Sequence, residues 1–477
     1  MVELTHGLKL LILIWHNTNI IKNFHSTYLF LPINMLHLIK KIFFTLAAIL
    51  ASINCLSADL ANLYFLAEKN DPIYQQEVSK HRIIIESRPQ ALAKLLPSLN
   101  LSGNTKRNAQ DISTSGSSIG ADGEVDFNSH GYSLNITQPL FRQDVFIALG
   151  QADVRIKESE AKLAKAQQDL IIKVSESYFN VLKSLDNLEF AKTEAVSLKR
   201  QLEQADQRFE VGLSAITDVQ EARAGYDLAV AEEIQAMNKT DNAKEQVREL
   251  TGEYISQFHS LGDEIILVKP NPEEINSWTE LAIKQNLDIS AANFALESAR
   301  KEIKKQSAGH LPTVDIVASH GYDSTGGRFG STRTDRAVIG LELNIPIYSG
   351  GLVSSKTREA HERYNQSMHY LEKARRTAQR ETREAYLGVI SGISQVNALK
   401  QAVVSSETAL LATESGFEVG TRTAVDVVVS QRATSKALRD YSNAKYNYIL
   451  NTLKLKRSAG TLSPDDLNLI NDWLIKK

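Results

Sequence analysis

The chain has 477 residues, a formal net charge of −2 and one cysteine, Cys55. This mild charge balance gives no support to nucleic-acid binding, which needs a basic surface, and a lone cysteine excludes an internal disulfide. Only ten prolines are present, and none falls between Pro139 and Pro270 or between Pro346 and Pro464, so long helices are predicted in those two tracts instead of several ordinary globular domains.

The first segment, residues 1–58, is predicted to be an N-terminal extension with a secretory signal peptide. Two lysines precede an apolar run at Ile42–Ile53 that ends in small residues, a pattern too short for a membrane-spanning helix. Another apolar patch lies before Met35, so the translation start is either Met1 or Met35. Since Cys55 lies in this segment, no cysteine-ligated metal site is expected after it.

The remainder of the chain is a duplication. The phrase FEVG occurs at 209–212 and again at 417–420, and Gly252 is matched by Gly460 at the same spacing. In chain order the predicted parts are a first repeat at 59–252 (helix 59–93, strands 97–106 and 130–141, long helical hairpin 143–252), an irregular connector at 253–288, a second repeat at 289–462 (helix 289–307, strands 311–322 and 336–348, long helical hairpin 350–460) and a tail at 463–477.

Each strand pair alternates apolar and polar residues, as in SLNLSGN after Pro97 and YSLNIT from Tyr132. This period of two predicts a hairpin with one apolar face. A half-buried sheet in a soluble domain explains the alternation, and so does a membrane β-barrel with lipid outside and water inside. Four strands cannot close a barrel, and an open edge cannot face lipid. A membrane barrel would therefore need several chains, and three chains would supply twelve strands.

The long tracts have a coiled-coil seam, with apolar residues from Ile156 onward at spacings of three, four and seven. FEVG then lies at the reversal between two helices. Gly212 and Gly420 are expected in the left-handed conformation there. Capping boxes are predicted to start the outgoing helices, from Thr217 to Gln220 and from Thr423 to Asp426.

Catalytic motifs are missing from the sequence. There is no HExxH, P-loop, GxSxG or strand-linked GxGxxG, and the histidines are scattered without ligand spacing. We therefore expect no enzyme activity, no catalytic residues, no cofactor and no metal.

Several phrases together resemble the TolC-type outer-membrane efflux channels over nearly all of the chain after the signal segment. They are AEKNDP at 67–72, QRFEVGLSAITDVQEARAGYD at 207–227, GHLPT at 309–313, IPIYSGG at 345–351, VGTRTAVDV at 419–427 and AKYNYILNTLKLKRSAGTL at 444–462. The fold class this implies is mainly α with membrane β: a homotrimer whose twelve-stranded β-barrel in the outer membrane continues into a twelve-helix periplasmic α-barrel.

The function implied by the resemblance is a passive exit duct of tripartite efflux or type I secretion systems, carrying drugs, toxic compounds or proteins. Its implied partners are an inner-membrane pump, a periplasmic adaptor protein and outer-membrane lipid. The turns at Gly212 and Gly420 are expected to contact the adaptor. The alternative is a periplasmic coiled-coil adaptor or structural protein, although an adaptor normally has one hairpin and this chain has two.

The resemblance also implies a periplasmic gate between the helical hairpins. Its arginine matches Arg422, its acceptors match Asp218 and Thr217, and a glutamine on the preceding helix matches Gln201. Arginine suits such a role because its planar, permanently charged fork binds several oxygens. Without the resemblance, Arg422 would be read as an exposed loop residue. Phe417 stands where the family commonly has a tyrosine, which predicts a less firmly latched gate.

The resemblance places the constriction of the tunnel at Asp426 and Val429, where the family commonly has two aspartates a turn apart. With valine at the second position, a trimer would present three carboxylates instead of six. A weaker cation preference and weaker block by multivalent cations are therefore predicted.

Overall fold

The structure is a computed structural model that describes residues 57–113, 122–262 and 265–475. The predicted N-terminal segment 1–58 lies outside the described residues except for Ser57 and Ala58, and so do the two possible start residues, Met1 and Met35. None of the helices in these ranges combines the length and apolar character needed to cross a membrane.

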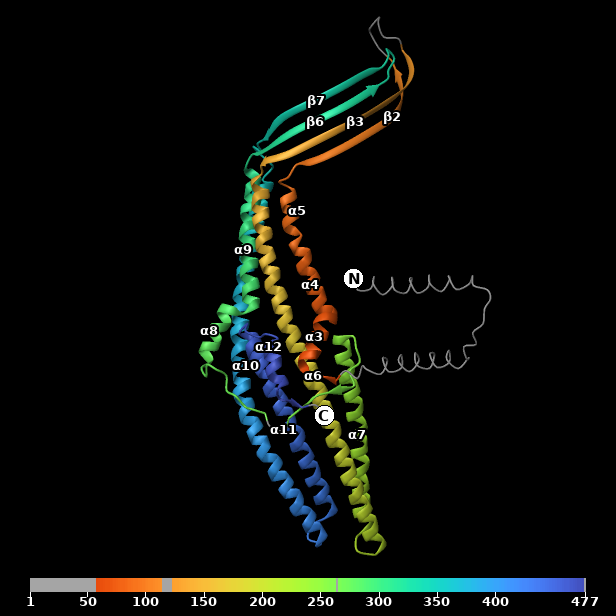
Figure 1. Cartoon of the computed structure of the whole chain (residues 1–477), viewed down its shortest axis with the longest axis vertical. Coiled ribbons are helices and arrows are strands. Elements are labelled where there is room, and N and C mark those ends of the chain that lie inside the picture. Colours follow the sequence, from red (N-terminus) through yellow and green to blue (C-terminus); the bar gives the residue numbers. More distant parts are fainter. Residues whose placement is uncertain (1–56, 114–121, 263–264, 476–477) are drawn as a thin grey trace, which may run out of the picture. The chain divides into compact units, whose positions relative to one another are not determined.

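Two long helical hairpins run through the described chain (Figure 1). In the first hairpin α6 (Gln143–Glu210) is followed by α7 (Ile216–Thr251), and in the second α10 (Leu352–Glu418) is followed by α11 (Ala424–Ser458). Helix α6 has 68 residues, which at 1.5 Å per residue is about 100 Å. The absence of proline permits this length because each backbone N–H can join the helical ladder.

Shorter helices flank the long ones. The stretch expected as one helix at 59–93 is three helices, and a break falls at Asp71, whose carboxylate accepts a hydrogen bond of 3.1 Å from the Ile73 N–H. Pro72 follows as the first helical residue, where its missing N–H costs nothing. The bounds are α3 (Leu60–Asn70), α4 (Pro72–Ile85), α5 (Ser87–Ala93), α9 (Leu287–Ser307) and the 3₁₀ turn η2 (Ala308–His310).

The two strand pairs form one antiparallel sheet in the order β2-β3-β6-β7. The central β3–β6 pairing joins the first repeat to the second. In the first pair the strands extend further toward the connecting loop than the predicted 97–106 and 130–141, because pairing continues from Ser98–Thr137 to Ile112–Gly123. The bounds are β2 (Ser98–Ile112), β3 (Gly123–Phe141), β6 (Thr313–Thr325) and β7 (Thr332–Asn344).

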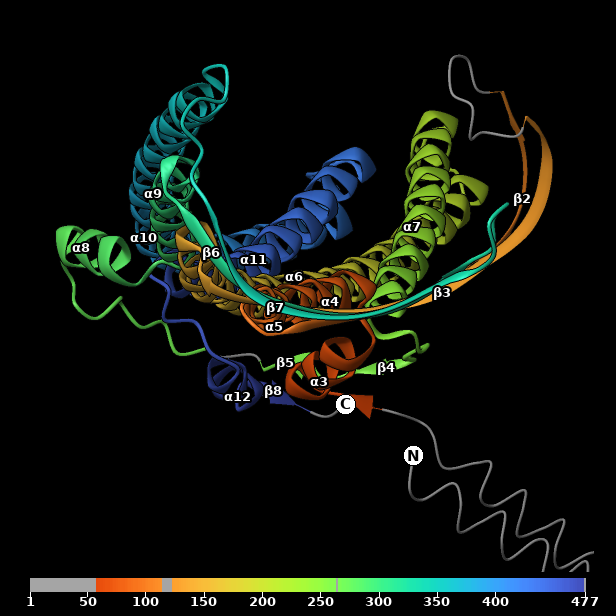
Figure 2. The same cartoon turned by 90° about the horizontal axis from the view of Figure 1, so that it is seen from above.

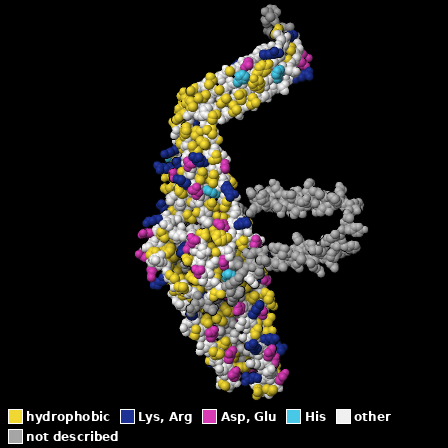
Figure 3. All heavy atoms as spheres, in the orientation of Figure 1, with side chains coloured by type: hydrophobic (Ala, Val, Ile, Leu, Met, Phe, Trp, Pro, Cys, Tyr) yellow, Lys and Arg dark blue, Asp and Glu magenta, His cyan; other side chains and the backbone are white. Residues whose placement is uncertain are grey.

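The sheet has one apolar and one polar face, as the alternation predicts. Ile136 of β3 pairs with Ala318 of β6, which pairs with Ile339 of β7, and all three share a face. On the other face the hydroxyls of Ser102 and Ser133 lie 2.9 Å apart. Ile339 is 80% exposed in the single chain, and Figure 3 shows hydrophobic side chains gathered over the part of the strands next to the helices. Among the residues that the structure describes, this face therefore has no partner that covers Ile339.

The connector between the repeats lies against the middle of the long helices. The backbone of Val268 exchanges hydrogen bonds of 2.8 and 2.9 Å with the Tyr448 hydroxyl of α11, and the Tyr178 hydroxyl of α6 donates to the His259 carbonyl. The short elements of this band are β1 (Ser57–Ala58), β4 (Gln257–Phe258), β5 (Ser260–Leu261), α8 (Ile275–Gln285), α12 (Asp465–Asn471) and β8 (Leu474–Ile475), in which β1 pairs with β4 and β5 with β8. Figure 2 shows β4, β5, β8 and α12 on one side of α6, while α8 lies apart from them beside α10.

Candidate functional site: the two hairpin turns

The first turn, residues 211–215, reverses the chain between α6 and α7. Gly212 has φ +77°, the left-handed conformation expected for it. Its N–H donates to the Phe209 carbonyl at 2.9 Å, and the next N–H, of Leu213, reaches the Arg208 carbonyl at 2.7 Å. These bonds satisfy carbonyls at the end of α6 that have no partner within the helix.

The predicted capping box from Thr217 to Gln220 is wrong. Helix α7 begins one residue earlier than Thr217, so the N-cap is Ala215, which has no side-chain acceptor. The Asp218 carboxylate instead accepts a 3.3 Å hydrogen bond from the Ala215 N–H. Half of a capping box therefore remains, and it holds Asp218 against the start of its own helix.

The second turn, residues 419–423, has both halves of the predicted box. The Asp426 carboxylate accepts from the Thr423 N–H at 2.9 Å, and the Asp426 N–H donates to the Thr423 hydroxyl oxygen at 3.2 Å. The Thr423 N–H and then the Thr423 hydroxyl, which both donate to the Asp426 carboxylate at 2.9 Å, hold the pKa of Asp426 below its usual range. Gly420 has φ +80°, which confirms the left-handed conformation predicted for it.

The predicted gate residues do not meet one another within one chain. Arg422 is exposed and folds back on its own turn, while Asp218 and Thr217 lie at the start of α7. In the described part of the chain Arg422 forms no ion pair with Asp218. The Gln201 side-chain oxygen is buried without a hydrogen-bond partner in the structure.

A residue that the sequence did not point to joins the two turns. The Arg208 guanidinium carbon lies 4.8 Å from the centre of the Phe417 ring. Its Nη1 also donates to the Phe417 backbone carbonyl at 3.4 Å. The sequence contains one signal for this pair: at the repeat spacing, Arg208 corresponds to a glycine, Gly416, in the second repeat.

The predicted constriction residues share one face of α11. Asp426 and Val429 are three residues apart, hence neighbours on a helix surface. Val429 is 61% exposed and Asp426 partly exposed. The pair is thus an apolar and an anionic side chain side by side on an uncovered surface.

Further from the turns, a buried carboxylate lies between the hairpins. Glu194 of α6 is 2% exposed and approaches Arg432 and Arg439 of α11 at 3.9 and 3.8 Å. Burial raises its pKa, although the Ser435 hydroxyl and both arginines act in the opposite direction. The sequence analysis did not single out this residue, because a glutamate on a long helix carries no local signal of burial.

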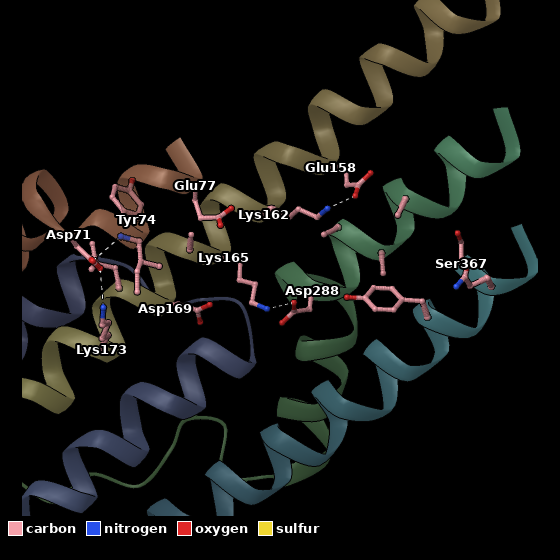
Figure 4. A pocket seen from close by; sticks show the side chains of 18 residues that line it. Asp71, Tyr74, Glu77, Glu158, Lys162, Lys165, Asp169, Lys173, Asp288 and Ser367 are labelled. Carbon is pink, nitrogen blue, oxygen red and sulfur yellow. Dashed lines mark hydrogen bonds and ion pairs between the residues drawn. The ribbon is translucent and has the colours of Figure 1, made fainter. Parts of the chain in front are cut away.

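A hollow of about 630 Å³ between α4, α6, α9 and α10 is the other recess of note (Figure 4). Its charged side chains are paired: Lys165 with Asp288 at 2.5 Å, and Lys162 with Glu158 at 2.6 Å. The described residues contain no group of three or more histidine, cysteine, aspartate or glutamate side chains placed to bind a metal ion. The hollow is therefore a feature of the helix wall, with its charges already satisfied.

Comparison with known proteins gives consistent results. A family model described as outer membrane efflux protein matches residues 74–253 and 278–461. Outer membrane protein TolC of Vibrio cholerae is 35% identical over 421 residues, which cover 87% of this chain and 94% of that protein. The alkaline protease secretion protein AprF of Pseudomonas aeruginosa is 28% identical over 410 residues, which cover 85% of this chain and 85% of that protein. The CmeC outer membrane channel of Campylobacter jejuni superposes with a TM-score of 0.74 at 17% identity, over 87% of this chain and 89% of that one.

Proposed function

Because the chain belongs to the outer membrane efflux protein family, and is a TolC-like outer-membrane channel, we propose that three copies form one passive duct through the outer membrane and periplasm. Proteins of this family are transport channels, not enzymes, and work as trimers with efflux pump complexes or in type I secretion. The helices form the periplasmic extension of the channel.

The incomplete sheet is the observation that supports the proposal of a trimeric duct. Its edge strands are β2 and β7, and its apolar face is uncovered. Edge strands leave backbone groups unpaired, which lipid cannot satisfy. If β7 of one copy pairs with β2 of the next, three copies close a barrel of twelve strands with lipid against the apolar face.

The partners are a periplasmic adaptor and an inner-membrane pump, which together select the cargo and supply the energy. The two turns are the adaptor-contact surface. Apolar side chains flank their glycines and are well exposed, with Val211 at 69%, Leu213 at 73% and Val419 at 75%. Exposed apolar side chains at a loop tip favour a protein contact. Gly212 and Gly420 lie at the centres of this surface.

Deletion of the gene tests the duct. The deletion strain is expected to become sensitive to a panel of toxic compounds, and the complementing protein to run as a heat-modifiable trimer from the outer-membrane fraction. A soluble periplasmic monomer would instead support the alternative of an adaptor or structural coiled coil.

We propose that Arg422 makes its gate contacts with residues of a neighbouring copy in the trimer. Arg422 is exposed in the single chain, so it is accessible to Asp218 and Thr217 of a neighbouring copy. Gln201 would join the same set through its unpartnered side-chain oxygen. With no hydroxyl at Phe417, the gate has one hydrogen bond fewer and closes less firmly.

Replacing Val429 by aspartate is expected to tighten block by a trivalent cation roughly tenfold, because the three added carboxylates lie one helical turn from those of Asp426. Single-channel recordings at increasing cation concentration measure the block. The matched control is Val429→Asn, which has the same size and no charge and should leave the block weak. Submicromolar block of the unmodified channel would contradict the constriction assignment.

A further inference from the structure

We propose that Arg208 is a clamp that holds the end of the first hairpin against the end of the second through Phe417. The inference rests on the proposed function, because it concerns how the tunnel is held closed. Arg208 thus stabilises the closed state in addition to Arg422, from a different position and through a different partner.

The geometry of Arg208 gives it two simultaneous contacts. Its guanidinium lies over the face of the Phe417 ring at 4.8 Å, and the Nη1–H donates to the carbonyl of the same residue at 3.4 Å. The planar fork of arginine allows both, whereas the point charge of lysine does not combine stacking with a directed hydrogen bond. Both side chains are half-buried, so water weakens the contacts only in part.

The charge of Arg208 also suits its position. It lies in the last turn of α6, and the carbonyl that it reaches belongs to the last turn of α10. Each helix end carries a partial negative charge from carbonyls without helical partners. One cation placed between two such ends reduces their mutual repulsion. The clamp thus stabilises the approach of the two helix ends as well as the side-chain pair.

The duplication separates the roles of the two arginines. At the spacing of the repeat, Arg208 corresponds to Gly416, and Ser214 corresponds to Arg422. A Cβ atom at Gly416 would lie 2.7 Å from Cγ of Arg422, so a side chain at this position would require Arg422 to shift. In the second turn the arginine thus lies against its own helix end, whereas the arginine near the first turn reaches across to Phe417.

Apolar packing between the two hairpins lies further from the turns than the contact of Arg208 with Phe417. The Val428 side chain of α11 packs with Leu198 and Ala229 of the first hairpin, and it lies 3.5 Å from the point where a Cβ atom of Gly225 would be. Closer to the turns, the apolar cluster of Ala205, Val219 and Ala222 lies within the first hairpin alone. Among the described residues, Arg208 and Phe417 form a contact that crosses between the hairpins there, and we expect it to govern how far the tips separate.

The test compares Arg208→Ala with Arg200→Ala, an exposed arginine two turns earlier on α6. In trimers that carry no other cysteine, spin labels attached to Leu213→Cys and Val419→Cys report the separation of the turns. Planar-bilayer recordings of the unlabelled trimers report opening. Arg208→Ala is expected to broaden the distance distribution and raise the open-to-closed ratio roughly two- to fivefold per subunit. Arg200→Ala should match the unmodified protein in both measurements.

Phe417→Leu removes the ring and keeps an apolar side chain and the carbonyl, so it tests the clamp without the loss of a charge. It should broaden the same distribution, and adding Arg208→Ala to it should increase opening by less than Arg208→Ala does alone. Unchanged distances and conductance in both single variants would overturn the clamp while the channel itself remained intact. Failure of the unmodified protein to conduct at all would instead overturn the proposed function.

Discussion

Replacing Ile339 by arginine is expected to abolish the outer-membrane trimer. Ile339 lies in the middle of β7, 80% exposed on the apolar face of the sheet. A charged side chain on the lipid face of a barrel costs about 2–4 kcal/mol near the membrane centre, and a trimer carries the substitution three times. The yield of heat-modifiable trimer in the outer-membrane fraction measures the effect.

The neighbouring residue provides the control. Val338 precedes Ile339 on the same strand and faces the opposite side of the sheet, where it pairs with Ser319. Val338→Arg adds the same side chain on the polar face, which the proposed barrel turns toward water. Trimer yield should stay close to that of the unmodified protein. Equal yields for the two variants would contradict the assignment of lipid to the apolar face.

Replacing Arg422 by serine is expected to raise the resting conductance of the channel. An exposed ion pair contributes at most about 1 kcal/mol, which shifts a two-state gate roughly fivefold per subunit. Three subunits lose the contact together, so the combined shift toward the open state exceeds that of one pair. Planar-bilayer recordings measure this as a larger mean conductance at the same voltage.

The control for this substitution is Arg223→Ser, at an exposed arginine early in α7. It removes the same charge from the same end of the protein without touching the proposed gate, and conductance should not change. Conductance of Arg422→Ser equal to that of the unmodified channel would remove Arg422 from the gate and leave the clamp at Arg208 as the contact to consider.

Local features were predictable because their signals lie within a few residues of each other. The left-handed turns at Gly212 and Gly420 and the capping box from Thr423 to Asp426 follow from short-range stereochemistry. The break at Asp71 also had a local signal, an N-cap residue followed by proline, which the prediction of one helix at 59–93 overlooked. Thr217 would be the N-cap of a helix that starts at Asp218, but α7 starts at Ile216, two residues earlier, and this places Thr217 inside the helix.

The sequence by itself determined the duplication, the long helices and the alternating strands, because repeat spacing and periods of two and 3.6 residues are properties of the chain alone. Only the tertiary structure decided that β3 pairs with β6, that Glu194 is buried between hairpins, and that Arg208 contacts Phe417 within one chain. Each of these contacts joins residues from different hairpins or repeats. Their formation depends on how whole helices and strands pack against one another, which no local period or motif in the sequence specifies.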